Sequence, residues 1–179
     1  MIALFAAIIV VLGLIPPIML GFFPVPIHAQ SLGALLAGVV LGARAGTLSV
    51  LLLLALVAIG LPVLSGGRGG LAVFLSPTAG YLVGYLPAAF VSGWVSDKVA
   101  QGKTDGRRIF AGFFVAATLG VIINHAFGIA WLVAYVGLSP YDALLGDLVF
   151  VPGDLLKAAI AAYAGQFVFA NFGNRQRII

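Results

Sequence analysis

Residues 45–64 read AGTLSVLLLLALVAIGLPVL and form a long uninterrupted apolar segment. It contains no Asp, Lys or Arg, and consecutive leucines occupy positions 51–54 near its middle. A helix needs about 20 mainly apolar residues to cross the hydrocarbon core of a bilayer. The stretch is therefore predicted to be a membrane-spanning helix, with Pro62 close to its end.

The composition of the whole chain points the same way. Apolar residues make up 63% of the 179 residues, charged residues make up 8%, and Glu is absent. A soluble domain has roughly 25% charged residues, whereas a lipid bilayer requires no such polar cover. The sequence therefore predicts an all-α integral membrane protein. We expect no cleavable signal peptide, because no basic segment precedes the first apolar run.

Six apolar runs are predicted to be transmembrane helices. They cover approximately residues 1–15, 30–43, 45–64, 78–95, 108–135 and 152–172. The first two are short for a complete span, which favours burial by other helices or a locally thin bilayer. Together the six helices are expected to form a single transmembrane domain over residues 1–179, in a multi-pass protein of the cell membrane.

The basic residues predict how these helices are oriented. With the N-terminus inside the cell, the inner side has most of the nine Lys and Arg residues, namely Arg44, Lys98, Lys103, Arg107, Arg108, Arg175 and Arg177. The outer side has Arg68, with Asp142 and Asp147 near it. Cytoplasmic loops of membrane proteins are enriched in Lys and Arg, so both termini are predicted to be cytoplasmic. This pattern also explains the net charge of +4 without a nucleic-acid partner.

Three segments are predicted to meet on the outer side, residues 21–30, 61–77 and 137–152. The first is stiffened by two prolines and is too apolar for an ordinary solvated loop. The second contains a glycine cluster, residues 66–70, which Arg68 interrupts. The N–H groups of Gly66 and Gly67 can face an anion. A flexible linker is the alternative interpretation of this cluster.

The last predicted helix has the sharpest chemical signal. Asp154 and Lys157 are three positions apart, so both lie on one face of the helix, about a turn inside the apolar zone. A charge inside the membrane costs about 2.5–3.5 kcal/mol and is a functional hypothesis by default. The alternatives are an interaction of Asp154 with the helix dipole and a Lys157 side chain that extends to the outer interface. We favour a buried polar pocket.

Other polar residues fit either such a pocket or a structural role. Asn124 and His125 lie midway along the fifth predicted helix, where packing and ligand contact explain them equally well. Tyr81 and Tyr85 share one face of the fourth helix, and can be interfacial residues or walls of an apolar pocket. Thr78 can simply cap that helix.

Sequence patterns typical of enzymes are missing. Cysteine and Glu are absent, the histidines lack the spacing of metal ligands, and neither a Gly-x-Ser-x-Gly nor a Gly-x-x-x-x-Gly-Lys-Ser/Thr segment occurs. We therefore expect no catalytic residue, no metal, no cofactor and no nucleotide hydrolysis by this chain. The remaining enzyme hypothesis is a membrane enzyme with Asp154 and His125 as acid and base.

Six short motifs occur in an order that is similar to one known family. They are residues 23–26 (FPVP), Gln30, residues 60–63 (GLPV), the glycine cluster 66–70, residues 77–82 (PTAGYL) and residues 152–157 (PGDLLK). Together they resemble the BioY family, the biotin-binding S components of energy-coupling-factor vitamin transporters, over nearly the whole chain. The sequence departs from the family pattern at His28, where Thr is usual, and at Ser76 and Ala79, where Gly is usual.

The resemblance implies a six-helix S-component fold with a high-affinity biotin site near the outer surface. The implied partners are a transmembrane coupling (T) subunit and two ABC-type ATPases. The residues that we expect at the biotin site are Asp154, Lys157, Arg68, Gly66, Gly67, Thr78, Tyr81, Tyr85, Asn124 and Gln30.

Biotin has a ureido group, an apolar bicycle and a carboxylate, and these groups suit the expected residues. Asp154 can accept hydrogen bonds from the ureido N–H groups, and either Lys157 or Arg68 can bind the carboxylate. The sequence leaves open which of the two cations does so. It also leaves open an S component for another small vitamin, and a biotin carrier that works without the ATPases.

Ala3 and Ala7 are four positions apart and share one face of the first predicted helix. Small side chains at this spacing let another helix approach closely. In the family an alanine pair at this place docks the coupling subunit, so the resemblance implies the same role here. Packing within the bundle is the alternative.

Overall fold

The structure is a computed structural model that describes residues 1–102 and 105–172. In chain order the helices are α1 (Ile2–Gly13), α2 (Gln30–Leu41), α3 (Ala43–Ala58), α4 (Ala79–Gln101), α5 (Gly106–Trp131), α6 (Pro140–Asp147) and α7 (Val151–Phe172). Short 3-10 helices, η1 (Leu71–Leu75) and η3 (Leu148–Phe150), and a π-helical end of α5, η2 (Leu132–Val136), complete the elements. Of the basic residues used to orient the chain, Lys103, Arg175 and Arg177 lie outside the described residues.

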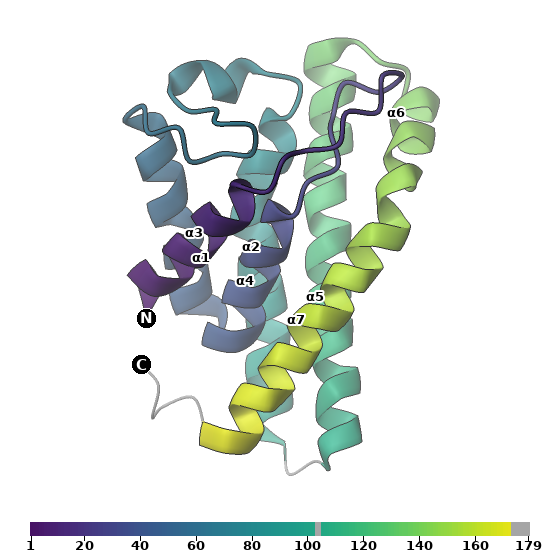
Figure 1. Ribbon diagram of the computed structural model, residues 1–179. Coiled ribbons are helices and arrows are strands. Elements are labelled where there is room, and N and C mark those ends of the chain that lie inside the picture. Colours follow the sequence, from purple (N-terminus) through teal and green to yellow (C-terminus); the bar gives the residue numbers. More distant parts are fainter. Residues whose placement is uncertain (103–104, 173–179) are drawn as a thin grey trace.

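The prediction of an all-α protein is confirmed. The six predicted helices correspond to α1–α5 and α7, and the described residues contain only isolated β-bridges besides helices and loops. As Figure 1 shows, α2 to α5 and α7 form a bundle, and α1 packs obliquely against α2 and α3. Gly42, with φ of 85°, connects α2 to α3, and the Asp97 carboxylate accepts a hydrogen bond of 3.0 Å from the N–H of Ala43.

The structure corrects two of the predicted boundaries. The third helix ends at Ala58 and not near Leu64, because Gly60 has φ of 101° and Pro62 follows it. The fourth helix continues to Gln101, well beyond residue 95. Its last turn includes Lys98, whose Nζ lies 3.6 Å from the centre of the Trp94 ring.

The segment 137–152, predicted only as an outer connection, contains the helix α6. Ser139 begins it as the N-cap, because its hydroxyl accepts a hydrogen bond of 3.1 Å from the N–H of Asp142. Pro140 occupies the first helical position, which suits its fixed φ. These residues are local signals that the sequence contained, and they position Asp147 at the end of the helix.

The outward faces of the helices are apolar. Among the described residues, Gly106–Val136 is long and apolar enough to cross a membrane, and α1, α2 and α3 are apolar but shorter. Large apolar side chains such as Leu51, Phe90, Ile122 and Phe167 are exposed. Water would be an unfavourable solvent for such a surface, and lipid chains suit it.

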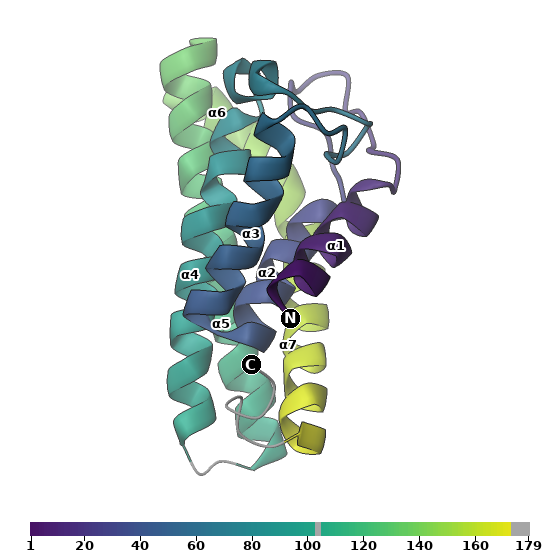
Figure 2. The ribbon, with the colours of Figure 1, turned by 90° about the vertical axis from the view of Figure 1, so that its left-hand side faces the viewer.

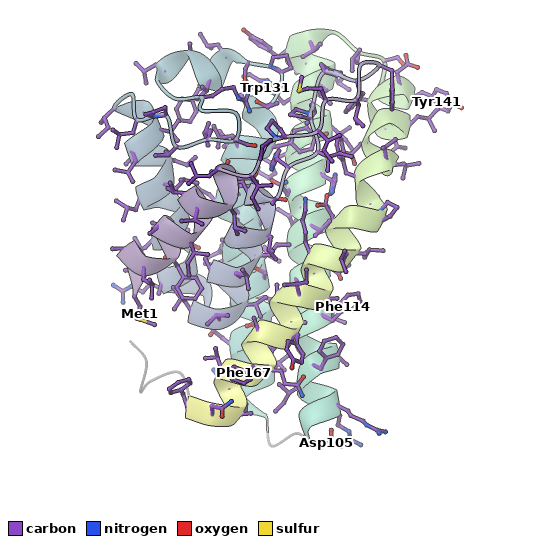
Figure 3. The ribbon with its side chains drawn as sticks, in the orientation of Figure 1. Met1, Asp105, Phe114, Trp131, Tyr141 and Phe167 are labelled. Carbon is purple, nitrogen blue, oxygen red and sulfur yellow. The ribbon has the colours of Figure 1, made fainter. Side chains whose placement is uncertain are left out.

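The loops and α6 gather at one end of the bundle (Figures 1 and 2). Residues 14–29 and 59–78 lie side by side there, and α4 ends and α5 begins at the opposite end. In Figure 3, Trp131 and Tyr141 mark the loop end and Asp105 marks the other. Three clusters of buried apolar residues fill the interior, and one of them, around Phe23, Tyr81 and Phe150, lies at the loop end.

Candidate functional site

The ammonium group of Lys157 connects three segments of the chain. Its Nζ donates hydrogen bonds to Asp154 Oδ1 at 2.7 Å, to the Ser31 hydroxyl at 2.9 Å and to the His28 carbonyl at 2.7 Å. An ammonium group has three N–H donors, so all of them are used. Lys157 therefore ties α7 to the start of α2 and to the loop that precedes it.

Asp154 also contacts a histidine that bridges two carboxylates. His125 Nε2 lies 2.9 Å from Asp154 Oδ2, and His125 Nδ1 lies 2.7 Å from Asp147 Oδ1. The Tyr81 hydroxyl donates a hydrogen bond of 2.7 Å to the same Asp147 oxygen. The exposed fractions are 3% for Asp147, 8% for His125 and 9% for Asp154, so the charges are buried. We call Tyr81, His125, Asp147, Asp154 and Lys157 the polar cluster.

Packing around Tyr81 explains why the polar cluster forms here. The Tyr81 ring lies against Gly128 of α5 so closely that a Cβ atom on residue 128 would collide with it. The ring stands edge-on to His125, with a centroid distance of 6.1 Å, and to Phe150, at 6.4 Å. Phe150 follows α6, the helix that brings Asp147 over the bundle.

Three adjoining hollows surround the polar cluster. The first is lined by Tyr85, Asn124, His125 and Asp154, among others, and the second shares Asn124 and Asp154 with it and adds Lys157. The third, beneath the loops, is lined by residues that include Val25, His28, Gln30, Arg68, Thr78, Tyr81, Leu82 and Tyr85. Their volumes are about 10, 30 and 20 Å³, enough for one or two water molecules each. Side chains such as His28 and Tyr81 separate the second from the third.

Arg68 is at the edge of the third hollow. Its Nε donates to the Ser65 carbonyl at 3.2 Å, and its Nη1 donates to the Thr78 hydroxyl at 3.1 Å. Thr78 is also 2.9 Å from the Ser76 hydroxyl. Within the part of the chain that the structure describes, the hydrogen-bond partners of Arg68 are thus neutral groups.

The structure brings together most of the residues expected at the site. Asp154, Lys157, Arg68, Thr78, Tyr81, Tyr85, Asn124 and Gln30 all line the hollows. Gln30 also holds the loop, because its amide donates to the Val63 carbonyl at 2.9 Å and accepts from the Ser65 N–H at 3.0 Å. Gly66 and Gly67 do not line the hollows: they form an exposed turn with φ of 79° and 69°.

Sequence reasoning missed several residues of this region. His28, Ser31 and Phe150 line the second hollow, and Asp147 belongs to the polar cluster although the sequence suggested only a charge near the outer surface. A histidine inside an apolar span requires a polar partner. This need for a polar partner is the feature of the sequence from which the contact between His125 and Asp147 could have been predicted.

Two buried polar atoms at the hollows lack a hydrogen-bond partner among the described residues. They are Asn124 Oδ1 and His28 Nδ1. Burial, together with the positive charge of Lys157, lowers the pKa of His28 from its ordinary value of 6.5 to about 4. His28 is therefore neutral at pH 7, and its ring can offer either a donor or an acceptor to a ligand.

Ala3 and Ala7 line none of the three hollows. Both are exposed on α1, while Phe5, Ala6 and Ile9 form the buried face of the same helix. The buried face contacts α2 and α3. The alanine pair is therefore on a surface of the described bundle and does not pack inside it.

Comparisons with known proteins agree on one family. A model of the BioY family matches residues 1–174. A relative from Rhizobium etli, named biotin transporter BioY, is 55% identical over 171 residues, which cover 95% of this chain and 91% of the relative. A relative of the same name from Rhodobacter capsulatus is 49% identical over 178 residues, with coverage of 94% and 90%. A crystal structure of the S-component for biotin from an ECF-type ABC transporter superposes with a TM-score of 0.90 at 35% identity, covering 99% of this chain and 93% of that chain.

Proposed function

The chain belongs to the BioY family, and from this premise we propose that it is the biotin-binding S component of an energy-coupling-factor (ECF) transporter. In this role it binds biotin with high affinity and delivers it across the cell membrane. The solved S component for biotin has the same fold over nearly the whole chain. Relatives named as biotin transporters support transport, and not catalysis, as the function.

The observation that carries the proposal is the buried ion pair of Asp154 and Lys157 beside the hollows. Burying charged groups is costly unless they are paired, and such groups mark functional sites in membranes. The ureido group of biotin both donates and accepts hydrogen bonds. Asp154 can accept from its N–H groups, and Lys157 can donate to its oxygen if it releases one of its present acceptors.

Charge favours one orientation of the vitamin. Lys157 already has an anionic partner at 2.7 Å, whereas the hydrogen-bond partners of Arg68 among the described residues are a carbonyl and a hydroxyl. A carboxylate gains more from a cation that has no anionic partner. We therefore place the biotin carboxylate at Arg68, in the third hollow, and the ureido group at Asp154 and Lys157. Val25, which lines both the second and the third hollow, and Tyr85, which lines the first and the third, then offer apolar walls between them.

The proposed partners are a transmembrane coupling (T) subunit and two ABC-type ATPases. The exposed pair Ala3 and Ala7 on α1 supports a docking surface for the coupling subunit. Lys98, Arg107 and Arg108 lie near the end opposite the loops, which supports a cytoplasmic location for that end and for both termini. The chain would then be a single multi-pass domain of the cell membrane.

Titration of labelled biotin into the purified protein tests the proposal. We expect saturable binding, which unlabelled biotin displaces and other small vitamins do not. Lys157→Met should weaken binding at least about tenfold, because it leaves Asp154 without its ammonium partner. Lys98→Met is the matched control at the opposite end of the bundle and should bind as the parent does. Absence of biotin binding by the parent would refute the proposal, and equal binding by the Lys157 and Lys98 variants would place the biotin site elsewhere in the chain.

A further inference from the structure

The contacts of His125 restrict where protons can be in the polar cluster. Each ring nitrogen lies within 2.9 Å of a carboxylate oxygen, Nδ1 of Asp147 and Nε2 of Asp154. A hydrogen bond needs one proton between its two heavy atoms, and neutral imidazole has a single N–H. Two protons must therefore be shared among the ring and the two carboxyl groups.

The Tyr81 hydroxyl indicates where the second proton is. It donates to Asp147 Oδ1, the same oxygen that His125 Nδ1 contacts. An oxygen that accepts two hydrogen bonds is best ionised, and an ionised Asp147 requires His125 to be the donor. On the other side, Asp154 is held ionised by Lys157 at 2.7 Å. Both carboxylates thus favour the doubly protonated ring.

We propose that His125 is a permanent imidazolium, held by Asp147, and that this pair is a positioning device for Asp154 in the ligand site. The inference rests on the proposed function, since its test uses biotin binding. With His125 and Lys157 as cations and Asp147 and Asp154 as anions, the polar cluster has no net charge. A neutral cluster suits the neutral ureido end of the vitamin, and the charged carboxylate end is left for Arg68.

The other groups near His125 do not alter this assignment. Tyr81 comes from α4, Asp147 from α6, and Asp154 and Lys157 come from α7. His28 of the preceding loop lines the same hollow and is neutral at pH 7, and the Phe150 ring lies 6.4 Å from the His125 ring. Among these neighbours only Asp147 is an anion without a second cation. Removing the charge of Asp147 should therefore allow His125 to lose one of its two ring protons.

Nitrogen NMR of ¹⁵N-histidine tests the protonation directly. The chain has two histidines, so His28→Gln leaves the signals of His125 alone. We expect both ring nitrogens to show the protonated pattern from about pH 6 to 8, a range over which an ordinary histidine loses its charge. One protonated and one bare nitrogen at pH 7 would overturn the proposal.

Biotin binding tests the positioning role. Asp147→Asn keeps the size and the acceptor oxygen of residue 147 but removes its charge, so His125 should lose its proton as the pH rises. We expect the Kd of this variant to rise about tenfold between pH 6 and 8, while that of the parent changes less than about twofold. Asp142→Asn, on the exposed side of the same helix α6, is the matched control and should follow the parent.

Each outcome separates this inference from the proposed function. If the parent binds biotin and Asp147→Asn binds equally at both pH values, His125 is not the positioning residue, although the chain is still a biotin-binding protein. A uniform loss of binding at every pH would also overturn the proposal, since a purely structural role for Asp147 would have that effect. If the parent itself does not bind biotin, the proposed function fails first.

Discussion

Buried polar side chains have different hydrogen-bond partners at the loop end and in the opposite half of the bundle. At the loop end, polar and charged side chains from α4, α5, α6 and α7 bind one another, and His28 Nδ1 and Asn124 Oδ1 remain without a partner among the described residues. In the other half, Ser92 and Ser96 donate to backbone carbonyls. Thr118 Oγ1 on α5, which lines none of the hollows, also lacks a partner among the described residues. Buried alanines such as Ala117 and Ala162 lie there beside larger apolar side chains such as Phe113.

The difference shows how packing can be told from binding in such a bundle. A buried hydroxyl that donates to a carbonyl satisfies a local need and allows helices to approach. A buried group with spare hydrogen-bonding capacity is costly, and two of these groups, on His28 and Asn124, line the hollows of the proposed ligand site. The two halves therefore make separable predictions for ligand binding and for coupling to partners.

The largest effect should separate transport from binding altogether. Replacing both Ala3 and Ala7 by Trp adds bulk to the exposed face of α1, which should block close approach of the coupling subunit. We expect ATP-driven biotin uptake into proteoliposomes with the coupling module to be lost, while biotin binding by the solitary subunit is unchanged. Trp at Ala111 and Val115, an exposed pair with the same spacing on α5, is the control. Loss of binding together with uptake would instead show that the alanines pack the bundle.

A smaller effect should appear at the carboxylate end of the proposed site. Arg68→Ala should weaken biotin binding several-fold, and less than Lys157→Met, because Arg68 is half-buried in a loop. Biotin amide lacks the carboxylate, so the parent and the Arg68 variant should bind it about equally. Competition assays with both ligands provide the measurement. A variant that loses biotin and biotin amide to the same extent would place the carboxylate elsewhere.

Removing one hydrogen bond in each half of the bundle should affect biotin binding only at the loop end. Ser96→Ala loses the bond of 2.9 Å to the Val39 carbonyl, and Tyr81→Phe loses the bond of 2.7 Å to Asp147. Each should lower the free energy of unfolding in detergent by about 1 kcal/mol. Only Tyr81→Phe should also weaken biotin binding. Equal affinities of the two variants would erase the distinction between the halves.

The smallest effect concerns His28 and pH. Its pKa is about 4 in the folded chain and 6.5 ordinarily, so the unfolded chain binds more protons between these values. Stability therefore falls as the pH decreases through this window, and His28 alone accounts for about 0.7 kcal/mol between pH 7 and 6. His28→Thr should lack this component, which thermal unfolding at both pH values measures as a difference from the parent. The same pH dependence in both proteins would contradict it.

The sequence predicts the helical spans and the central ion pair because both depend on local spacing. Asp154 and Lys157 share a helix face at a separation of three, whatever the rest of the chain does. The contact between His125 and Asp147 depends on tertiary structure, since α6 must first turn Asp147 inward. The position of the glycine cluster also depends on tertiary structure: Gly66 and Gly67 form an exposed turn that lines none of the hollows. Clustered glycines predict a turn, but they do not predict where that turn lies relative to the ligand site.

Gly128 has no functional group and lines none of the three hollows described above. Any side chain there would nevertheless displace the Tyr81 ring, and with it the hydroxyl that supports Asp147. In a saturation mutagenesis scan selected for growth on scarce biotin, this position should tolerate almost no substitution, even alanine. A catalogue of ligand-contacting residues would omit it. The set of positions at which mutations abolish function is thus larger than the set that contacts the ligand. It includes a glycine whose contribution is to leave space for a neighbouring ring.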